Sequence, residues 1–114
     1  MSRRDNQRLA DILAAAAAIA DHLTRGELDD GLVFDAVRVR LIEIGEAVKA
    51  IDPDLLAREP AIPWIDVAGM RNHLAHRYFD TAHGIVQATV SEDLPTLVAA
   101  AKRLLDYLAV GPRS

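Results

Sequence analysis

The sequence contains no cysteine and is poor in aromatic residues and in basic charge. Because cysteine is absent from all 114 positions, a disulfide framework and a cysteine-ligated metal site are both excluded. Aromatic residues make up 4% of the chain, whereas 51% is hydrophobic, a balance typical of packed helices rather than aromatic-rich strands. The formal net charge is -4, so any nucleic-acid site has to be a local basic patch.

Long apolar runs are also missing. None approaches the length of a membrane span, and the first residues, MSRRDNQRLAD, are charged where a secretory signal would be apolar. Together with the absence of cysteine, this predicts a soluble cytoplasmic protein. With no internal repeat and no linker, residues 1–114 are expected to form a single domain.

Hydrophobic periodicity predicts four helical regions, over about 6–23, 33–51, 63–78 and 82–108. The segment PDLLA at 53–57 is expected to form one short helical turn. Gly45, inside the second region, indicates close contact with another helix, because glycine is otherwise unfavourable there. Pro95 is expected to kink or split the last region. Short connections then predict an all-α, up-and-down bundle of four to five helices.

One short segment, GMRNHLAHRYFD at 69–80, gathers cationic and proton-transferring side chains. On a helix, Arg71 and Tyr78 are nearly eclipsed, whereas Arg71 and His76 are about 140° apart around the axis. Side chains placed in this way can still converge on a ligand in a groove beside the helix. The segment therefore predicts a site with a guanidinium, the amide of Asn72, an imidazole and a phenol.

This set of groups suits RNA cleavage without a metal. The ribose 2′-OH attacks its own phosphate, so a base, an acid for the leaving oxygen and a cation for the phosphate are needed. Histidine can serve as base or acid at neutral pH, and arginine binds phosphate through paired donors. One histidine cannot easily do both in one turnover, so a two-fold dimer would supply the second.

At these residues the sequence resembles the HepT-type toxins of the HEPN superfamily. RNHLAHRY at 71–78 matches their motif of Arg, four residues, His, one residue and Tyr. The resemblance covers about residues 36–105, because three segments match in the same order. They are IGEAVKAI at 44–51, IPWIDVAGMRNHLAHRYFD at 62–80 and EDLPTLV at 92–98.

The resemblance implies an all-α HEPN homodimer whose motif helices meet at the dimer cleft, and metal-independent endoribonuclease activity. Arg71 and His76 would be the catalytic pair, and Asn72 the polar residue that helps to hold them. The chain would be the toxin of a type VII toxin–antitoxin pair, with an MNT-type nucleotidyltransferase antitoxin that transfers AMP to Tyr78. No metal or cofactor is expected, and both tRNA and mRNA stay open as the RNA substrate.

Several alternatives accompany this interpretation. Arg71 can also be interpreted as the ion-pair partner of Glu43 or Glu46, an arrangement that would orient it for catalysis. His73 and Arg77 are further candidates for supporting catalysis or RNA binding. The alternative function is a catalytically inactive helical adapter that binds a nucleotidyltransferase.

A metal site is the other chemical alternative. His73, His76, Asp80 and His83 include the ligand types that zinc prefers. The spacing after Tyr78 crosses an expected loop, however, and the mechanism above needs no metal. The nuclease interpretation is therefore preferred.

Overall fold

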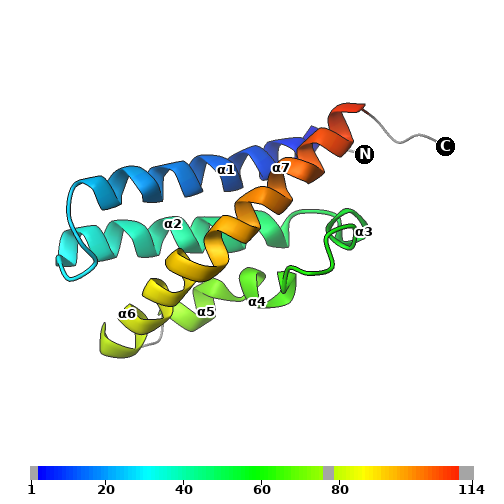
Figure 1. The fold of residues 1–114 in the computed structure, drawn as a ribbon. Helices are drawn as coiled ribbons and strands as arrows, with labels where there is room; N and C mark the ends of the chain where they lie inside the picture. The colour runs from blue at the N-terminus through cyan, green and yellow to red at the C-terminus, as the bar shows by residue number, and fades with distance from the viewer. Residues whose placement is uncertain (1–2, 76–78, 111–114) are drawn as a thin grey trace.

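Two long helices, α1 (Arg3–Thr24) and α2 (Gly31–Lys49), run antiparallel and pack along their length (Figure 1). A computed structural model describes residues 3–75 and 79–110, with side chains for residues 4–74 and 84–110. The elements after α2 are α3 (Pro53–Leu56), α4 (Trp64–Ala68), α5 (Met70–Ala75), α6 (Phe79–Ala88), the π-helical turn η1 (Thr89–Asp93) and α7 (Leu94–Val110). All of these are helical, which confirms the all-α class.

The remaining helices pack on α1 and α2 from two directions. The pair α4 and α5, green in Figure 1, contacts α2 on the side away from α1. The rod formed by α6, η1 and α7 then returns obliquely across α2 and reaches α1. Counted as rods, the helices make a bundle of four with α3 as an extra turn, in agreement with the predicted four to five.

The core lies where α1, α2 and α7 meet. Asp30 caps the start of α2 by accepting a hydrogen bond from the Leu32 N–H at 2.8 Å, so the helix begins where its apolar face begins. The spacing of three and four that predicted these helices is the spacing of the residues that they bury. The largest fully buried side chains are Leu9, Ile12, Ile19, Val37, Leu41, Ile44, Val48, Leu55, Leu74, Val86 and Leu104.

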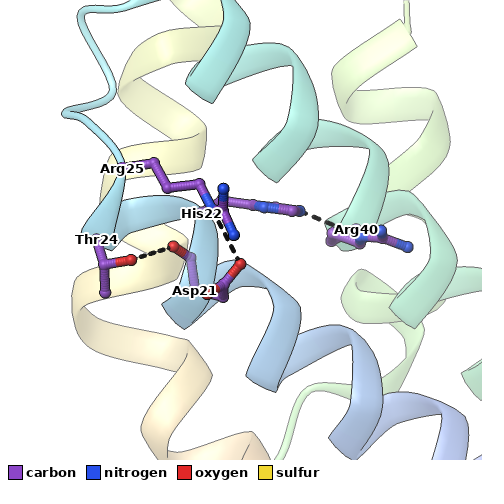
Figure 2. Close-up of polar contacts among 5 residues, drawn as sticks. All are labelled: Asp21, His22, Thr24, Arg25 and Arg40. Carbon is purple, nitrogen blue, oxygen red and sulfur yellow. Dashed lines mark hydrogen bonds and ion pairs between the residues drawn. The ribbon is translucent and has the colours of Figure 1, made fainter.

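Polar contacts at the end of α1 fix its position against α2. Asp21 accepts hydrogen bonds from Arg25 Nε at 3.2 Å and, through its carbonyl, from Thr24 Oγ1 at 2.6 Å (Figure 2). One residue later, His22 Nε2 accepts a hydrogen bond from Arg40 Nε of α2 at 3.4 Å. This contact joins the last turn of α1 to the middle of α2.

The third predicted helix is divided, and the expectation of one continuous helix over 63–78 was wrong. Gly69 ends α4, donating its N–H to the Ile65 carbonyl at 3.0 Å. The Gly69 carbonyl in turn accepts from the N–H groups of Asn72 and His73, at 3.0 and 3.2 Å, so α5 starts at once.

The last helical region is irregular just before Pro95 rather than at it. The Leu94 N–H bonds to the Thr89 carbonyl, five residues earlier, which defines the π-helical turn. Pro95 lacks an N–H, and its ring would clash with the carbonyl of residue 91 in a regular helix. The wider turn relieves that clash, so the helical rod passes through Pro95 within α7.

A pair of hydrogen bonds ties α7 to the turn that precedes α4. Arg103 donates from Nη2 to Glu59 Oε1 at 2.6 Å and from Nε to Oε2 at 3.1 Å. These bonds hold the pKa of Glu59 below its usual range. The Glu59 carbonyl also accepts from Trp64 Nε1 at 3.0 Å, so one residue anchors both α7 and α4.

Glu59→Gln is expected to lower the melting temperature at neutral pH and to have a smaller effect at acidic pH. Because the folded-state pKa lies below the unfolded one, the pair stabilises the fold above the usual carboxylate range. This contribution is lost as the pH falls through the lowered pKa. Thermal unfolding followed by circular dichroism measures the melting temperature at each pH, and the exposed Glu27→Gln is the control. An equal loss for Glu59→Gln at both pH values would contradict the ion-pair explanation.

Candidate active site

The motif helix α5 is held against α2 by a glycine. Leu74 is buried and Met70 is partly buried, so these two residues form the inward face of α5. A Cβ at Gly45 of α2 would lie 2.7 Å from the Val67 carbonyl oxygen and 3.2 Å from Met70 Cβ. Only a residue without a side chain permits this approach, which confirms the close helix contact predicted at Gly45.

Arg71 projects from α5 toward the outer side of α2. Its Nη1 lies 3.4 Å from Glu46 Oε1, and its side chain is 66% exposed. Glu46 also accepts from Lys49, at 3.3 Å between Nζ and Oε2. The hydrogen bond from Lys49, followed by that from Arg71, holds the pKa of Glu46 below its usual range. Among the described residues, Arg71 is thus a charged group paired with one carboxylate, and its side chain is 66% exposed.

The two acidic residues considered as partners of Arg71 have different contacts. Glu46 contacts Arg71, whereas Glu43 accepts from Arg40 Nη1 at 3.0 Å. Arg40 is also the residue that donates to His22 (Figure 2). Glu43 therefore belongs to a group of contacts between α1 and α2, and Glu46 is the acidic residue placed to orient Arg71.

Asn72 and His73 are both exposed but lie on different sides of α5. Asn72 directly follows Arg71, with its amide open to solvent. His73 is two residues from Arg71, or about 200° around the helix, and it faces α7, where it lines a cavity with Leu97. His73 is therefore placed on the flank of α5 away from Arg71.

His76, Arg77 and Tyr78 lie outside the described residues, so their placement relative to Arg71 stays a prediction. Of the residues considered for a metal site, only His73 has a described side chain. Within the side chains that are described, no three His, Cys, Asp or Glu residues come together as a possible metal site. Across the described helices, none is long and apolar enough to cross a bilayer.

An open groove lies over α1 and α2, and Arg71 is linked to it only through its ion-pair partner Glu46. It has a volume of about 750 Å³, and Glu46 stands on its border. Alanines form much of its floor, and three ion pairs stand around it, Arg8–Asp11, Arg40–Glu43 and Lys49–Glu46. The sequence did not predict this groove, although the run of alanines at 14–18 was the available signal. Small side chains on α1 leave room beside the outer face of α2.

A family described as "Ribonuclease HepT-like" has a sequence profile that matches residues 9–104, which include every element from the middle of α1 to α7. The chain belongs to the HepT-like ribonuclease family. This membership confirms the resemblance found at RNHLAHRY. Its enzyme class is accordingly that of an endoribonuclease.

Individual relatives of this HepT-like ribonuclease also carry ribonuclease names. A protein of Thermococcus cleftensis named "Probable ribonuclease HepT" is 34% identical over 109 residues, which cover 91% of this chain and 98% of that protein. A protein of Methanocaldococcus jannaschii named as a candidate RNase is 31% identical over 102 residues, 85% of this chain and 94% of its own. A protein of Caldanaerobacter subterraneus, also named as a candidate RNase, is 37% identical over 68 residues. These residues cover 59% of this chain and 61% of that protein. No solved structure matches significantly.

The site of this HepT-like ribonuclease offers one clear chemical function among its described residues. Arg71 presents a permanently charged, planar donor group that is 66% exposed. Asn72 adds an exposed amide next to it. Together these groups can bind and orient a phosphate.

Proposed function

We propose that this ribonuclease is the toxin of a type VII toxin–antitoxin pair and cleaves tRNA or mRNA in the cytoplasm without a metal. The observation that carries the proposal is the exposed guanidinium of Arg71, held by Glu46 at 3.4 Å on the motif helix. A scissile phosphodiester carries one negative charge shared by two non-bridging oxygens, which an arginine can bind through two parallel hydrogen bonds. The RNA phosphate would replace Glu46 as the partner of Arg71, and Lys49 would keep the Glu46 carboxylate paired.

The proposed cleavage step is a transesterification within the RNA. A histidine removes the proton from the 2′-OH, and the 2′ oxygen forms a bond to phosphorus. The bond to the 5′ oxygen breaks, and a second acid protonates that oxygen, leaving a 2′,3′-cyclic phosphate and a 5′-hydroxyl. Arg71 stabilises the negative charge on the phosphate oxygens, and Asn72 helps to hold the pair. A homodimer across the motif helix α5 would bring His76 from each subunit to one cleft.

Control by an antitoxin follows from the motif tyrosine. We assign Tyr78 as the residue to which an MNT-type nucleotidyltransferase partner transfers AMP. The tyrosine oxygen attacks the α-phosphate of ATP, and pyrophosphate leaves. The AMP phosphate then adds negative charge near Arg71 and competes with RNA for it.

Cleavage of RNA by the purified chain is expected to persist in excess chelator and to be lost in His76→Ala. His73→Ala is the matched control on the same segment, and it is expected to retain cleavage because His73 faces away from Arg71. Gel analysis of end-labelled RNA measures both variants, with circular dichroism to verify folding. A folded wild type that leaves RNA intact would support the inactive adapter instead, and loss of cleavage on chelation would reject the metal-free mechanism.

The modification is tested by mass. After incubation with the partner and ATP, the intact chain is expected to gain the mass of one or more AMP groups, and Tyr78→Phe is expected to gain none. Tyr107→Phe is the matched control, because Tyr107 packs against Arg58 at 3.7 Å from its ring centre. Additions that persist in Tyr78→Phe would show that another residue accepts the AMP.

A further inference from the structure

A second hollow lies on the flank of α5 that faces away from Arg71. Its volume is about 500 Å³, within the range of small-molecule sites. It is bounded by α4 and α5 on one side, by η1 and the start of α7 on the other, and by α2 beneath. The wall formed by α4 and α5 is a single stripe with helical spacing that continues across the break at Gly69: Pro63, Asp66, Val67, Met70 and His73.

The floor of this cavity is apolar. Leu41 and Ile44 of α2 form part of it, and each is only 2% exposed. The other apolar side chains around the cavity are Ile62, Val67, Met70, Ile85, Leu94 and Leu97. An apolar body placed here would leave water for a largely hydrophobic surface, which favours binding.

The opposite wall depends on the π-helical turn. Thr89 and Asp93, the first and last residues of η1, both face the cavity. Thr89 Oγ1 donates to the Ile85 carbonyl at 2.7 Å, so its hydroxyl supports the turn. Asp93 then adds a carboxylate to the rim. Single π-helical turns inside α-helices occur frequently at functional sites.

The charge at the rim selects the ligand. Among the described lining residues, the charged groups are the carboxylates of Asp66 and Asp93, and none is a lysine or arginine. His73 contributes an imidazole. Such a rim, as far as the described residues form it, disfavours phosphate. It attracts a cation, and the apolar floor favours one with a hydrophobic body.

We propose that this cavity binds a small organic cation, in which an amine or guanidinium is carried on an apolar body. Asp66 and Asp93 accept charge-assisted hydrogen bonds from the cationic nitrogen, and the body lies on Leu41 and Ile44. The site is distinct from the phosphate site, because His73 and Arg71 lie on opposite flanks of α5. The proposal therefore does not depend on RNA cleavage, and its test uses no nuclease assay.

Titration of the chain with phenethylammonium tests the proposal directly. Backbone amide shifts in ¹H–¹⁵N spectra are expected to change at the lining residues, among them Asp66, His73 and Asp93. Phenylacetate, which has the same ring and the opposite charge, is expected to cause no such changes. Equal responses to the two probes, changes confined to other surfaces, or no change at millimolar phenethylammonium would overturn the proposal.

Two variants locate the binding. The double variant Asp66→Asn with Asp93→Asn keeps the shape of the cavity and removes its charge, so binding of phenethylammonium is expected to weaken about tenfold or more. Ala61→Trp fills the rim with an exposed residue and is expected to abolish binding, while Ala10→Trp on α1 should leave it unchanged. Unaltered binding in both the double variant and Ala61→Trp would place the ligand elsewhere and refute the assignment.

Discussion

Gly45→Ala is expected to lower the free energy of unfolding by about 1–3 kcal/mol, although alanine is the better helix former. The added methyl group would lie 2.7 Å from the Val67 carbonyl oxygen and 3.2 Å from Met70 Cβ. The first of these atoms belongs to the backbone, so no side-chain rotation relieves the clash. The helices α4 and α5 have to move away from α2, and packing around Leu74 is lost with them.

Gly84→Ala is the matched control for this prediction. Gly84 also lies inside a helix, α6, but a Cβ there would meet none of the described atoms within 4 Å. The same substitution is therefore expected to stabilise the chain by up to about 1 kcal/mol, through helix propensity alone. Urea unfolding of the two variants gives the change in the free energy of unfolding for each. A stabilising Gly45→Ala would show that α4 and α5 are not held against α2 as closely as the structure indicates.

Gly45→Ala should also reduce RNA cleavage beyond its effect on folding. Arg71 is positioned by α5 while its partner Glu46 is positioned by α2, and Gly45 sets the spacing between these helices. A shift of α5 changes where the guanidinium lies relative to Glu46. Cleavage by the fraction that remains folded is expected to fall, since misplacement of a catalytic group by about 1 Å can be costly.

The long helices could be predicted because their signal is local. Leu9, Ile12 and Ile19 follow the helical spacing in α1, and each is at most 1% exposed in the structure. The break at Gly69 could not be placed as well, because α4 and α5 each pack on α2, and that packing is not local in sequence. Pro95 did signal an irregularity, but the carbonyl that its ring would clash with lies one turn earlier, so the chain widens there.

The sequence alone could not decide which glutamate is the partner of Arg71. Glu43 and Glu46 are three residues apart, and both were candidates. Arg40 is three residues before Glu43, a spacing at which opposite charges pair on a helix, and this is the contact that forms. Lys49 has the same spacing from Glu46, yet Glu46 still reaches Arg71. The helical pair rule favours Glu46 only once the position of α5 is known.

The cavity beside His73 could not be predicted from the sequence. Its walls come from segments that periodicity assigns to separate helices, and its acidic rim combines Asp66 of α4 with Asp93 of η1. Neither residue belongs to the motif, and the sequence gives no reason to pair them. Their shared position follows from the oblique return of α7 across α2 (Figure 1).

Arg71→Ala is expected to lower the rate of RNA cleavage about 100-fold or more, the loss typical when a group that stabilises transition-state charge is removed. Arg71→Lys keeps the charge but not the paired donors, so its rate should lie between those of the alanine variant and the wild type. The stability of the fold should barely change, because the side chain is 66% exposed and its ion pair with Glu46 is at the surface. Single-turnover cleavage of a labelled RNA measures the rates.

Two comparisons separate a catalytic arginine from a surface one. Arg25 is also exposed, at 72%, and pairs with Asp21, so Arg25→Ala should leave cleavage unchanged. Glu46→Gln should lower the KM for RNA, because the phosphate then no longer competes with a carboxylate for Arg71. A plot of the logarithm of RNA affinity against the logarithm of salt concentration should have a shallower slope for Arg71→Ala, by the amount expected for about one lost phosphate contact. Equal cleavage by Arg71→Ala, Arg25→Ala and the wild type would remove Arg71 from the mechanism, and with it the idea that its outward guanidinium receives the phosphate.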